Sequence, residues 1–499
     1  MLRSIKPGVG LSLRAFSISS LSYSCSSLSV DIKLPNGIKY KQPTGLFIGN
    51  EFVKSKQEKT FEVINPSIDE VITSVYEAKE DDTELAIDAA RLAFQGGWPT
   101  CDPMIRSSAI NKLADLVEEN KEVIAGIESL DNGKALPLAC KDVDFAIQCL
   151  RFSETLAQYP FGRVINGGPN SLNYTRREPI GKIGPALVTG NSVVLKPAEC
   201  TPLTALYVSQ FIKEAGIPSG VYNLVSGLGT TVGEYLSRSP KVDKVAFTGS
   251  TATGKRILQN AADTNLKKVT LELGGKSPNI VFEDCDIEST VKNIIFSIYV
   301  NAGQVCCAGS RLFVQEGIKD KLVDKSIQAI SQLKVGDPFE EGTFQGPISS
   351  RKQFDKVMKY IELGKQEGAK VLIGGERHGD RGFFIKPTIF TSTTHKMKIV
   401  KGEIFGPVLV LDTFKTIDEV VAKANDTDYG LAAGAHTANL KNAIDVTNKL
   451  RAGTVWINTY NDNHYNLPFG GYKYSGFGRE LGFEVVDNYT QIKAVRMKF

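Results

Sequence analysis

Residues 191–227 have the sequence NSVVLKPAECTPLTALYVSQFIKEAGIPSGVYNLVSG, and they decide the fold class. A short β-branched run comes first, a helical pattern follows, and a second β-branched run ends the stretch. Residues 241–275 repeat this rhythm, with KVAFTGS and KVTLELGG as strands around the helical ATGKRILQNAA. Alternating strands and helices of this length predict a parallel sheet with helices on both faces. Such α/β sheets bind nucleotides beyond the carboxyl ends of their strands.

The rest of the chain extends this pattern in both directions. Residues 276–465 alternate again, with PNIVF, RLFVQ, KVLIGG, GPVLVLDTF and GTVWIN as strands, so a second α/β region is expected. Upstream, residues 45–65 alternate apolar and polar side chains around a turn, which is typical of a β-hairpin. Residues 81–97 and 104–130 are predicted helices. The tail, DNYTQIKAVRMKF, alternates once more and predicts an added edge strand.

Composition excludes several classes of protein. At 499 residues the chain is too long for one compact core, so two or three domains are expected. The net charge of +4 comes largely from residues 1–30, and the remainder is close to neutral, unlike a nucleic-acid binder. No apolar run reaches the ~18 residues of a membrane span. The eight cysteines form no CxxC pair and the four histidines no HExxH motif, so neither a disulfide framework nor a metal site is predicted.

The first thirty residues differ in composition from everything after them. They contain Arg3, Lys6 and Arg14, no acidic residue and ten serines. This composition is typical of a mitochondrial transit peptide, and it lacks the unbroken apolar core of a secretory signal. A disordered N-terminal tail is the alternative. We expect a transit peptide over residues 1–30 and a protein of the mitochondrial matrix.

Three glycine-rich or cysteine-containing segments are candidates for chemistry. FTGSTATGK (247–255) leaves a strand and opens a helix, so its backbone amides suit a phosphate, although a structural turn explains it equally well. SGLGTTVG (226–233) has the wrong spacing for a dinucleotide fingerprint and is read as a turn. Glu272 in LELGGKSP ends a strand, where a general base or an ion-paired carboxylate is expected. NAGQVCCAGSR (301–311) sets two thiols among small residues; a free cysteine is usually a small buried apolar residue, and the small neighbours raise a nucleophile as the alternative.

Taken together, these motifs resemble the aldehyde dehydrogenase superfamily, and most of all its mitochondrial-type tetrameric members. Glu272 is followed by Cys306 at 34 residues, as in the family's paired signature. The other matching motifs, in order, are NPS (65–67), YTRREPIG (174–181), GNSVVLKPAE (190–199), FTGST (247–251), EIFGPV (403–408) and PFGGYKYSGFGRELG (468–482). The resemblance covers roughly residues 40–499.

The resemblance implies a function and a role for each matched residue. The chain would oxidise an aldehyde to a carboxylic acid with NAD or NADP, through a thiohemiacetal and a thioester on Cys306. Cys307 would be a bystander, and Glu272 would activate water. The cofactor residues would be Lys196 and Glu199 at the adenosine ribose, Gly249 and Ser250 at the pyrophosphate, and Glu403 and Phe405 at the nicotinamide ribose and ring. A carboxylate at the ribose hydroxyls repels a 2′-phosphate, so Glu199 favours NAD.

The resemblance also implies a domain organisation. A Rossmann-like dinucleotide-binding domain would comprise residues 40–151 and 180–272, and an α/β catalytic domain residues 273–482. Residues 152–179 and 483–499 would form a small β arm for oligomerisation, and the resemblance implies a homo-oligomer, namely a tetramer.

One departure from the family is large. REPIG (177–181) runs directly into KIGPALVTGN (182–191), whereas the family inserts a strand, a PWN-type turn and the start of a helix. The first strand of the dinucleotide sheet and the Asn of the oxyanion hole would both be absent, and Asn191 belongs to a later turn. Either the recorded coding sequence is incomplete, or the chain is a catalytically impaired paralogue that acts as a binder or assembly partner.

Overall fold

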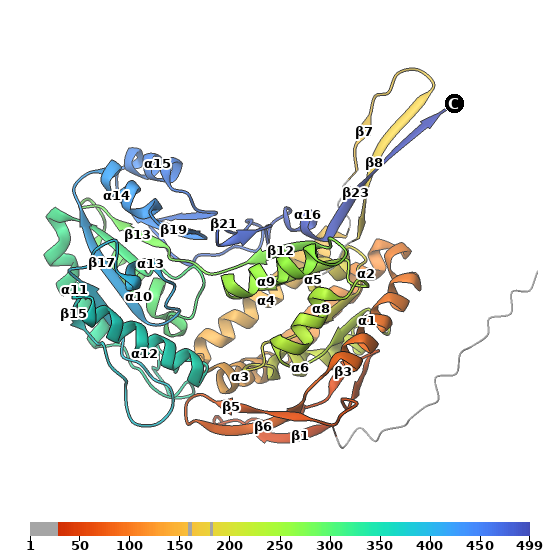
Figure 1. Cartoon of the computed structure of the whole chain (residues 1–499), viewed down its shortest axis with the longest axis horizontal. Helices are drawn as coiled ribbons and strands as arrows, with labels where there is room; N and C mark the ends of the chain where they lie inside the picture. Colours follow the sequence, from red (N-terminus) through yellow and green to blue (C-terminus); the bar gives the residue numbers. More distant parts are fainter. Residues whose placement is uncertain (1–27, 158–161, 180–182) are drawn as a thin grey trace, which may run out of the picture.

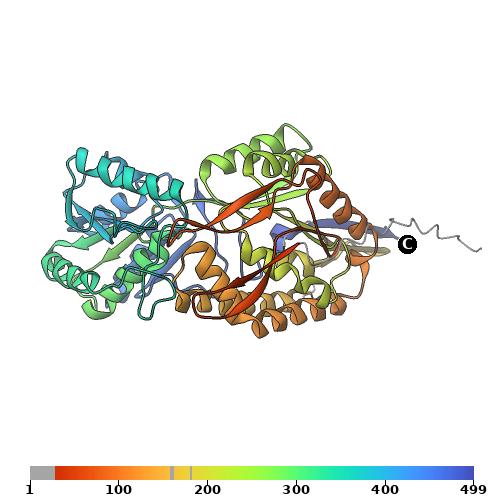
Figure 2. The same ribbon diagram turned by 90° about the horizontal axis from the view of Figure 1, so that it is seen from below.

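The protein has two lobes and a projecting arm (Figure 1). The structure, a computed structural model, describes residues 28–157, 162–179 and 183–499. The first lobe holds most residues up to β12 (Lys268–Glu272), and the second holds most of the rest. Figure 2, at right angles to the first view, shows the same two lobes side by side, with the arm extending from the first. Within the described residues, no helix is both long and apolar enough to cross a membrane, and no three His, Cys, Asp or Glu side chains gather as a metal site.

The second lobe is built on a seven-stranded sheet. Its strands, in spatial order, are β15 (Lys370–Ile373), β16 (Thr388–Thr391), β17 (Val408–Phe414), β14 (Arg311–Gln315), β13 (Pro278–Val281), β19 (Ala432–His436) and β20 (Thr454–Ile457). All neighbours are parallel except β15 and β16. The alternating side chains of β13 divide between two cores: Val281 packs with α10 (Ile287–Tyr299) and α11 (Lys319–Ser331), and Ile280 packs with α14 (Ile417–Asn425) and α15 (Leu440–Lys449). The predicted second α/β region is therefore present.

The strands expected in the first lobe are present, but they lie in two sheets instead of one. One sheet has the order β4 (Glu51–Val53), β3 (Leu46–Ile48), β10 (Tyr222–Leu224) and β9 (Val193–Leu195). The other has β11 (Lys244–Thr248), β12 and β22 (Gly476–Phe477). The sequence analysis expects the first strand of this sheet to be absent, and no described strand joins β9 to β11.

Burial shows where the sheet is interrupted. Every residue of β10 is buried, as expected for a strand covered on both faces. In β9 only Val193 is buried, and in β11 only Lys244, whereas the remaining residues of both strands are half-buried or exposed. Both strands that end at the interruption therefore lack the cover that a central strand normally has.

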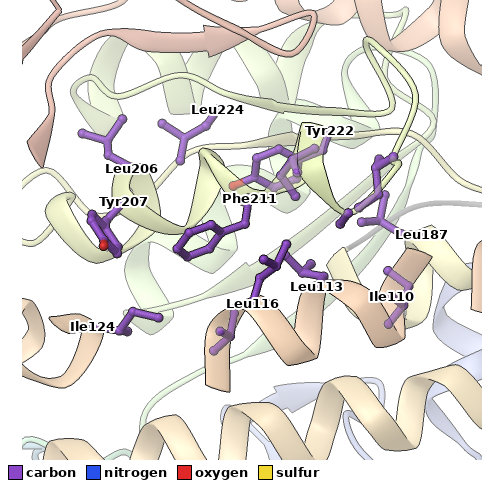
Figure 3. Close-up of a cluster of buried hydrophobic side chains, with 14 of the residues drawn as sticks. Ile110, Leu113, Leu116, Ile124, Leu187, Leu206, Tyr207, Phe211, Tyr222 and Leu224 are labelled. Carbon is purple, nitrogen blue, oxygen red and sulfur yellow. The ribbon is translucent and has the colours of Figure 1, made fainter. Parts of the chain in front are cut away.

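Helices of the first lobe enclose the largest apolar core (Figure 3). They are α1 (Glu80–Gln95), α2 (Pro103–Glu119), α3 (Lys121–Asn132), α4 (Leu136–Leu156), α5 (Ile183–Val188), α6 (Leu203–Ser209) and α7 (Phe211–Glu214). Two further helices of this lobe, α8 (Glu234–Arg238) and α9 (Thr251–Ala262), pack in smaller clusters. Ile110 and Leu113 of α2 lie opposite Leu187 of α5 and Phe211 of α7 in this cluster. The single helix predicted over 104–130 is two helices, because Asn120 leaves the helical conformation between them.

The arm is an antiparallel sheet of β23 (Thr490–Lys498), β8 (Ser171–Pro179) and β7 (Val164–Ile165), in that order. Its pairing runs from Thr490 beside Pro179 to Lys498 beside Ser171. The short helix α16 (Val485–Tyr489) leads into it, and Figure 1 shows the carboxyl terminus at its tip. The alternating tail is thus the edge strand that the sequence predicts.

The amino-terminal boundary differs slightly from the prediction. Residues 1–27 of the predicted transit peptide lie outside the described residues. Residues 29 and 30 belong to β1 (Ser29–Lys33), which pairs with β2 (Lys39–Pro43), and Leu28 is buried. A leader that ended at residue 30 would take with it part of this hairpin. Another hairpin, β5 (Thr60–Asn65) and β6 (Glu70–Tyr76), follows.

Candidate active site

Glu272 is the last residue of β12, next to the glycine loop that follows β11. Thr248 pairs with Glu272 in the parallel register, and the Gly249 amide donates to the Glu272 carbonyl at 3.0 Å. On the other side of β12, Glu272 pairs with Gly476, where an added Cβ would lie 2.0 Å from the Leu271 carbonyl oxygen. The predicted base and the predicted pyrophosphate loop are therefore adjacent at the carboxyl ends of neighbouring strands.

The two glycines after Leu273 allow three distant segments to meet. The Gly275 amide donates to Glu403 Oε1 at 3.1 Å. A Cβ at Gly274 would lie 2.1 Å from Glu403 Oε2, and one at Gly275 would lie 2.3 Å from the Cys306 carbonyl oxygen. Any larger residue would push Glu403 or Cys306 away. The LGG sequence thus brings the segments that contain Glu272, Cys306 and Glu403 into contact.

Cys306 lies in a tight loop after α10, and its sulfur is the more accessible of the two thiols. Gly303 has φ +71° in this loop, and a Cβ there would meet the Gly406 carbonyl oxygen at 2.2 Å. Cys306 is half-buried, whereas Cys307 is 3% exposed. A hydrogen bond from Cys307 lowers the pKa of the Cys306 thiol, and this effect outweighs burial and the nearby Glu403, which raise it. The Cys307 pKa is raised, first by its hydrogen bond with Cys306 and then by burial. Of the two thiols, Cys306 is therefore the one that loses its proton more readily.

The Glu403 carboxylate is largely removed from water. Burial raises its pKa, while the Gly275 amide and the ammonium groups of Lys356 and Lys276 oppose that rise. A buried carboxylate with cationic neighbours is suited to accepting hydrogen bonds from ligand hydroxyl groups.

Phe405 adopts φ +58°, which is uncommon outside glycine. The Gln353 amide donates to the carbonyls of Ile404 and Phe405 at 3.0 and 2.8 Å and thereby fixes this turn. The two cofactor residues Glu403 and Phe405 thus lie on one restrained loop beside Cys306.

Gly249 and Ser250 precede α9, a helix of 12 residues. Ser250 caps this helix, and its hydroxyl accepts from the Thr253 amide at 3.2 Å. A Cβ at Gly249 would lie 2.5 Å from the Phe247 ring, so the close turn requires glycine. The unpaired amides and positive dipole end of such a helix favour phosphate.

Lys196 and Glu199 follow β9, on the other sheet of the first lobe. The Lys196 ammonium donates to the Pro197 carbonyl at 2.8 Å and pairs with Glu199 at 3.2 Å. Burial acts to raise the pKa of Glu199, but its backbone hydrogen bond and the charges of Lys196 and Lys352 prevail and lower it. The pair predicted to hold the ribose, Lys196 and Glu199, is therefore formed, although it follows a strand of a different sheet from Ser250 and Glu272.

Asn191 does not replace the missing oxyanion amide. Its Nδ2 donates to the Ala186 and Tyr489 carbonyls, each at 3.1 Å, and lies 2.9 Å from the Thr189 hydroxyl. The residue is 2% exposed. Its amide is engaged in holding the turn after α5, as expected from its position in TGN.

Two residues near the site were not found from the sequence. Cys307 Sγ lies 3.3 Å from Asn461 Oδ1, and the Tyr460 hydroxyl donates to the Cys307 carbonyl at 3.0 Å. Both belong to a polar loop after β20, some 154 residues from the cysteines. No motif in NTYNDN indicates this contact, because it arises only when β20 takes its place in the sheet.

Comparisons of sequence and of structure with known proteins all find aldehyde dehydrogenases. A model of the aldehyde dehydrogenase family matches residues 52–495. An Aspergillus niger protein named aldehyde dehydrogenase is 52% identical over 490 residues, covering 95% of this chain and 99% of the relative. The human protein named mitochondrial aldehyde dehydrogenase is 47% identical, covering 91% of this chain and 92% of the relative. A solved NAD+ complex of aldehyde dehydrogenase from Bacillus cereus has a TM-score of 0.90 at 45% identity, covering 91% of this chain and 96% of that one.

The alignment lengths also bear on the short connection after Gly181. The alignment with the Aspergillus niger protein is 490 positions long, and it includes 95% of the 499 residues of this chain, which is about 474 residues. At roughly 16 positions, therefore, the relative has a residue and this chain has none. That is enough for a strand, a turn and a short piece of helix. The match of the family model, the relatives over nine-tenths of the chain and the shared fold show that this chain belongs to the aldehyde dehydrogenase family.

Proposed function

We propose that the site oxidises an aldehyde to a carboxylic acid with NAD, with Cys306 as nucleophile and Glu272 as base. The observation that carries the proposal is the meeting of three segments at Gly275. This residue follows Glu272 by three positions, lies against the Cys306 carbonyl and donates to Glu403. A base, a thiolate and a ligand-binding carboxylate are thus assembled at strand ends, where α/β folds bind their ligands.

The residues around the site fit NAD. The capped amino terminus of α9, preceded by Gly249, suits a pyrophosphate, and the restrained Glu403 suits the nicotinamide ribose. Glu199 stays ionised at neutral pH because its pKa is lowered, so it accepts from ribose hydroxyls and repels a 2′-phosphate. NAD is therefore preferred over NADP. When bound, NAD supplies the hydride acceptor.

The chain's own residues account for the remaining chemistry. The Cys306 thiolate attacks the aldehyde carbon, forming a carbon–sulfur bond and an oxyanion. Loss of hydride leaves a thioester on Cys306. Glu272 then takes a proton from water as the water oxygen attacks the thioester carbon. The carbon–sulfur bond breaks, the acid leaves, and the Cys306 thiolate is restored.

A second candidate function is a catalytically impaired member of the family that serves as a binder or assembly partner. The interruption between β9 and β11 favours it, because Glu199 and Ser250 stand on sheets that are not joined. The side chain of Asn191 is already engaged, so it adds no donor for the oxyanion. Inserting the absent segment between Gly181 and Lys182 and assaying the resulting protein distinguishes this candidate function from the first.

The arm supports a homo-oligomer, and we propose a tetramer. β23 pairs with β8 on one edge only, and its exposed apolar side chains include Ile492 at 64% and Phe499 at 80%. An open strand of this kind is an association hazard unless another subunit covers it. We accordingly assign residues 152–179 and 483–499 to the arm, 40–151 and 180–272 to the dinucleotide-binding domain, and 273–482 to the catalytic domain.

We propose the mitochondrial matrix as the location. The acid-free, serine-rich leader supports it, and the buried Leu28 and the start of β1 indicate that cleavage precedes residue 28. Sequencing the amino terminus of the protein from purified mitochondria tests this. A mature chain that still begins at Met1 contradicts it.

The activity is tested by NADH formation from acetaldehyde and NAD. The protein to assay carries the corresponding residues of the Aspergillus niger relative between Gly181 and Lys182. The matched control is the same protein with Cys306→Ala. NADH formation by the control overturns the assignment of the nucleophile, and its absence from both proteins favours the impaired paralogue.

A further inference from the structure

The loop that leads to Cys306 contains a run of left-handed backbone. Asn301, Ala302 and Gly303 have φ values of +50°, +52° and +71° in succession. Glycine adopts this conformation freely and asparagine tolerates it, whereas alanine is opposed by its Cβ, and such residues normally occur singly. The run is therefore strained, above all at Ala302, and strained backbone persists only where its surroundings hold it in place.

The side-chain amide of Gln304 bonds to three main-chain groups around this run. Its Nε2 donates to the Asn301 carbonyl at 3.1 Å and to the Pro347 carbonyl at 3.4 Å, and its Oε1 accepts from the Ser349 amide at 2.9 Å. Both hydrogens of the amide nitrogen are thereby used. Gln304 is 8% exposed, so little water reaches these bonds to compete for them. The amide thus ties the left-handed run to the segment that leads into α12 (Arg351–Gln366).

A close backbone contact restrains the opposite side of the run. A Cβ at Gly303 would lie 2.2 Å from the Gly406 carbonyl oxygen and 2.9 Å from the Ile298 carbonyl oxygen. Residue 303 therefore has no room to move toward either segment. With the Gln304 amide on one side and this contact on the other, the run is held between two parts of the second lobe.

The two cysteines are the central residues of the turn that follows Gln304. The Ala308 amide donates to the Val305 carbonyl at 3.0 Å and closes this turn. Cys306 is half-buried, whereas Cys307 is buried and its sulfur lies 3.3 Å from Asn461 Oδ1. The two central side chains of a turn point in different directions. A rotation of the turn would therefore change which of the two thiols is accessible.

We propose that Gln304 is a positioning residue that fixes the turn 305–308 so that Cys306, and not Cys307, faces the reactants. Its amide clamps the strained run directly before the turn, and the run sets the direction in which the turn begins. The proposal rests on the assignment of Cys306 as nucleophile, and it deepens that assignment by naming what selects one thiol of two. Gln304 acts through the backbone in this role, so no covalent bond forms or breaks.

The test is the ratio of the initial rates at which iodoacetamide alkylates Cys306 and Cys307 at one fixed pH, with each product located by fragmenting the peptide in a mass spectrometer. In the parent protein Cys306 should react at least about ten times faster, because alkylation needs an accessible thiol. Gln304→Met keeps the length of the side chain but removes all three hydrogen bonds. The ratio should then fall about tenfold, toward equal rates, because the strained run relaxes and the turn rotates.

A second variant separates positioning from a loss of packing. Ala302 has φ +52° and is 1% exposed, and glycine adopts this conformation without the steric penalty of alanine. Adding Ala302→Gly to Gln304→Met should therefore restore most of the ratio, since a run with less strain needs less restraint. A purely structural role of Gln304 predicts no such rescue. Gln332→Met, at an exposed position of the same lobe, is the control and should leave the ratio unchanged.

Two results would overturn the proposal. One is an unchanged ratio in Gln304→Met, and the other is a lowered ratio that Ala302→Gly does not raise. If circular dichroism shows that Gln304→Met does not fold, Gln304→Glu decides the matter. That variant keeps an acceptor for the Ser349 amide but lacks the donor nitrogen, so its ratio should lie below that of the parent protein. An unchanged ratio in Gln304→Glu would equally overturn the proposal.

This experiment separates the inference from the proposed function. Alkylation needs neither aldehyde nor NAD, so the ratio is measurable even in a protein without turnover. A lowered and rescued ratio in a protein without turnover leaves the inference standing while the proposed function fails. Turnover with an unchanged ratio overturns only the role of Gln304.

Discussion

Inserting a strand between Gly181 and Lys182 should both stabilise the protein and give it activity. The perturbation is the insertion, at this point, of the corresponding segment of the Aspergillus niger relative. β9 has three residues and β11 has five, and neither pairs with any described strand on its free edge. A central parallel strand would therefore make roughly six backbone hydrogen bonds, each worth about 1 kcal/mol net.

Apolar burial adds to this gain. Val194, Val245 and Phe247 are half-buried beside the interruption and would be covered by the new strand. Covering each of these side chains should add on the order of 1 kcal/mol to the free energy of unfolding, which is a fraction of the value for burying a whole side chain. The total is comparable to the ~5–15 kcal/mol by which a native protein is stable. The chain as it stands should therefore unfold at low urea concentration, and it should bind NAD weakly or not at all.

The insertion should also raise the reaction rate, because it supplies a hydrogen-bond donor to the oxyanion. The oxyanion formed at Cys306 lacks one donor, and losing such a donor costs roughly 10²–10³ in rate. Three assays measure the effects separately: urea denaturation measures stability, calorimetric titration measures NAD binding, and NADH absorbance with acetaldehyde measures turnover. An insertion of the same length made of glycine and serine is the matched control, and it should restore none of them. Turnover of ~1–10 s⁻¹ by the chain as it stands, an ordinary value for enzymes, would refute the reasoning.

Four further predictions concern residues described above, all in the protein that carries the insertion. Cys307→Ala should keep measurable aldehyde oxidation while Cys306→Ala loses it, and equal rates from the two variants would contradict the roles given to the thiols. Glu272→Gln should release one equivalent of NADH quickly and then stall, because the step that needs a base follows hydride transfer; an undiminished steady state in stopped-flow absorbance would count against it. Burial lowers the pKa of Lys276 from 10.5 to about 7, so between these values the unfolded chain holds a proton that the folded chain has released, and the free energy of unfolding should rise with pH. Urea titrations of Lys276→Met should lose that part of the slope, and identical slopes would exclude a lowered pKa for Lys276. Deleting residues 490–499 should convert the tetramer to smaller species in light scattering, whereas a monomer at micromolar concentration before deletion would rule out assembly through the arm.

Local patterns in the sequence were sufficient for most elements, whereas the roles of the site residues came from the family resemblance. The strands that contain Val193, Phe247 and Leu271 were predicted because β-branched and apolar runs alternate there with helical spacing. The break at Asn120 was missed because apolar residues continue at helical spacing on both sides of it. A polar residue in the middle of such a run gives no clear signal of a helix end.

Contacts between segments that are distant in the sequence could not be predicted from local patterns. Asn461 reaches Cys307 across 154 residues, and only the order of strands in the sheet brings them together. The interrupted sheet was foreseen only through the family resemblance, since an absent strand leaves no trace in the composition of the residues that remain. Local rules thus predicted what each segment forms, and not which segments meet.

The pairing of β8 with β23 has a consequence for how the protein is made. Arg177 donates to the Thr490 hydroxyl at 3.0 Å across 313 residues, and the whole strand pair spans a similar separation. During synthesis, β8 leaves the ribosome when most of the chain is still untranslated, and its partner is the last segment to be translated. Contacts of such long range form late, and an unpaired strand exposed meanwhile is prone to aggregate. The arm therefore leaves β8 unpaired until translation ends, and a ribosome that stops about ten codons early leaves that strand without β23 as its partner.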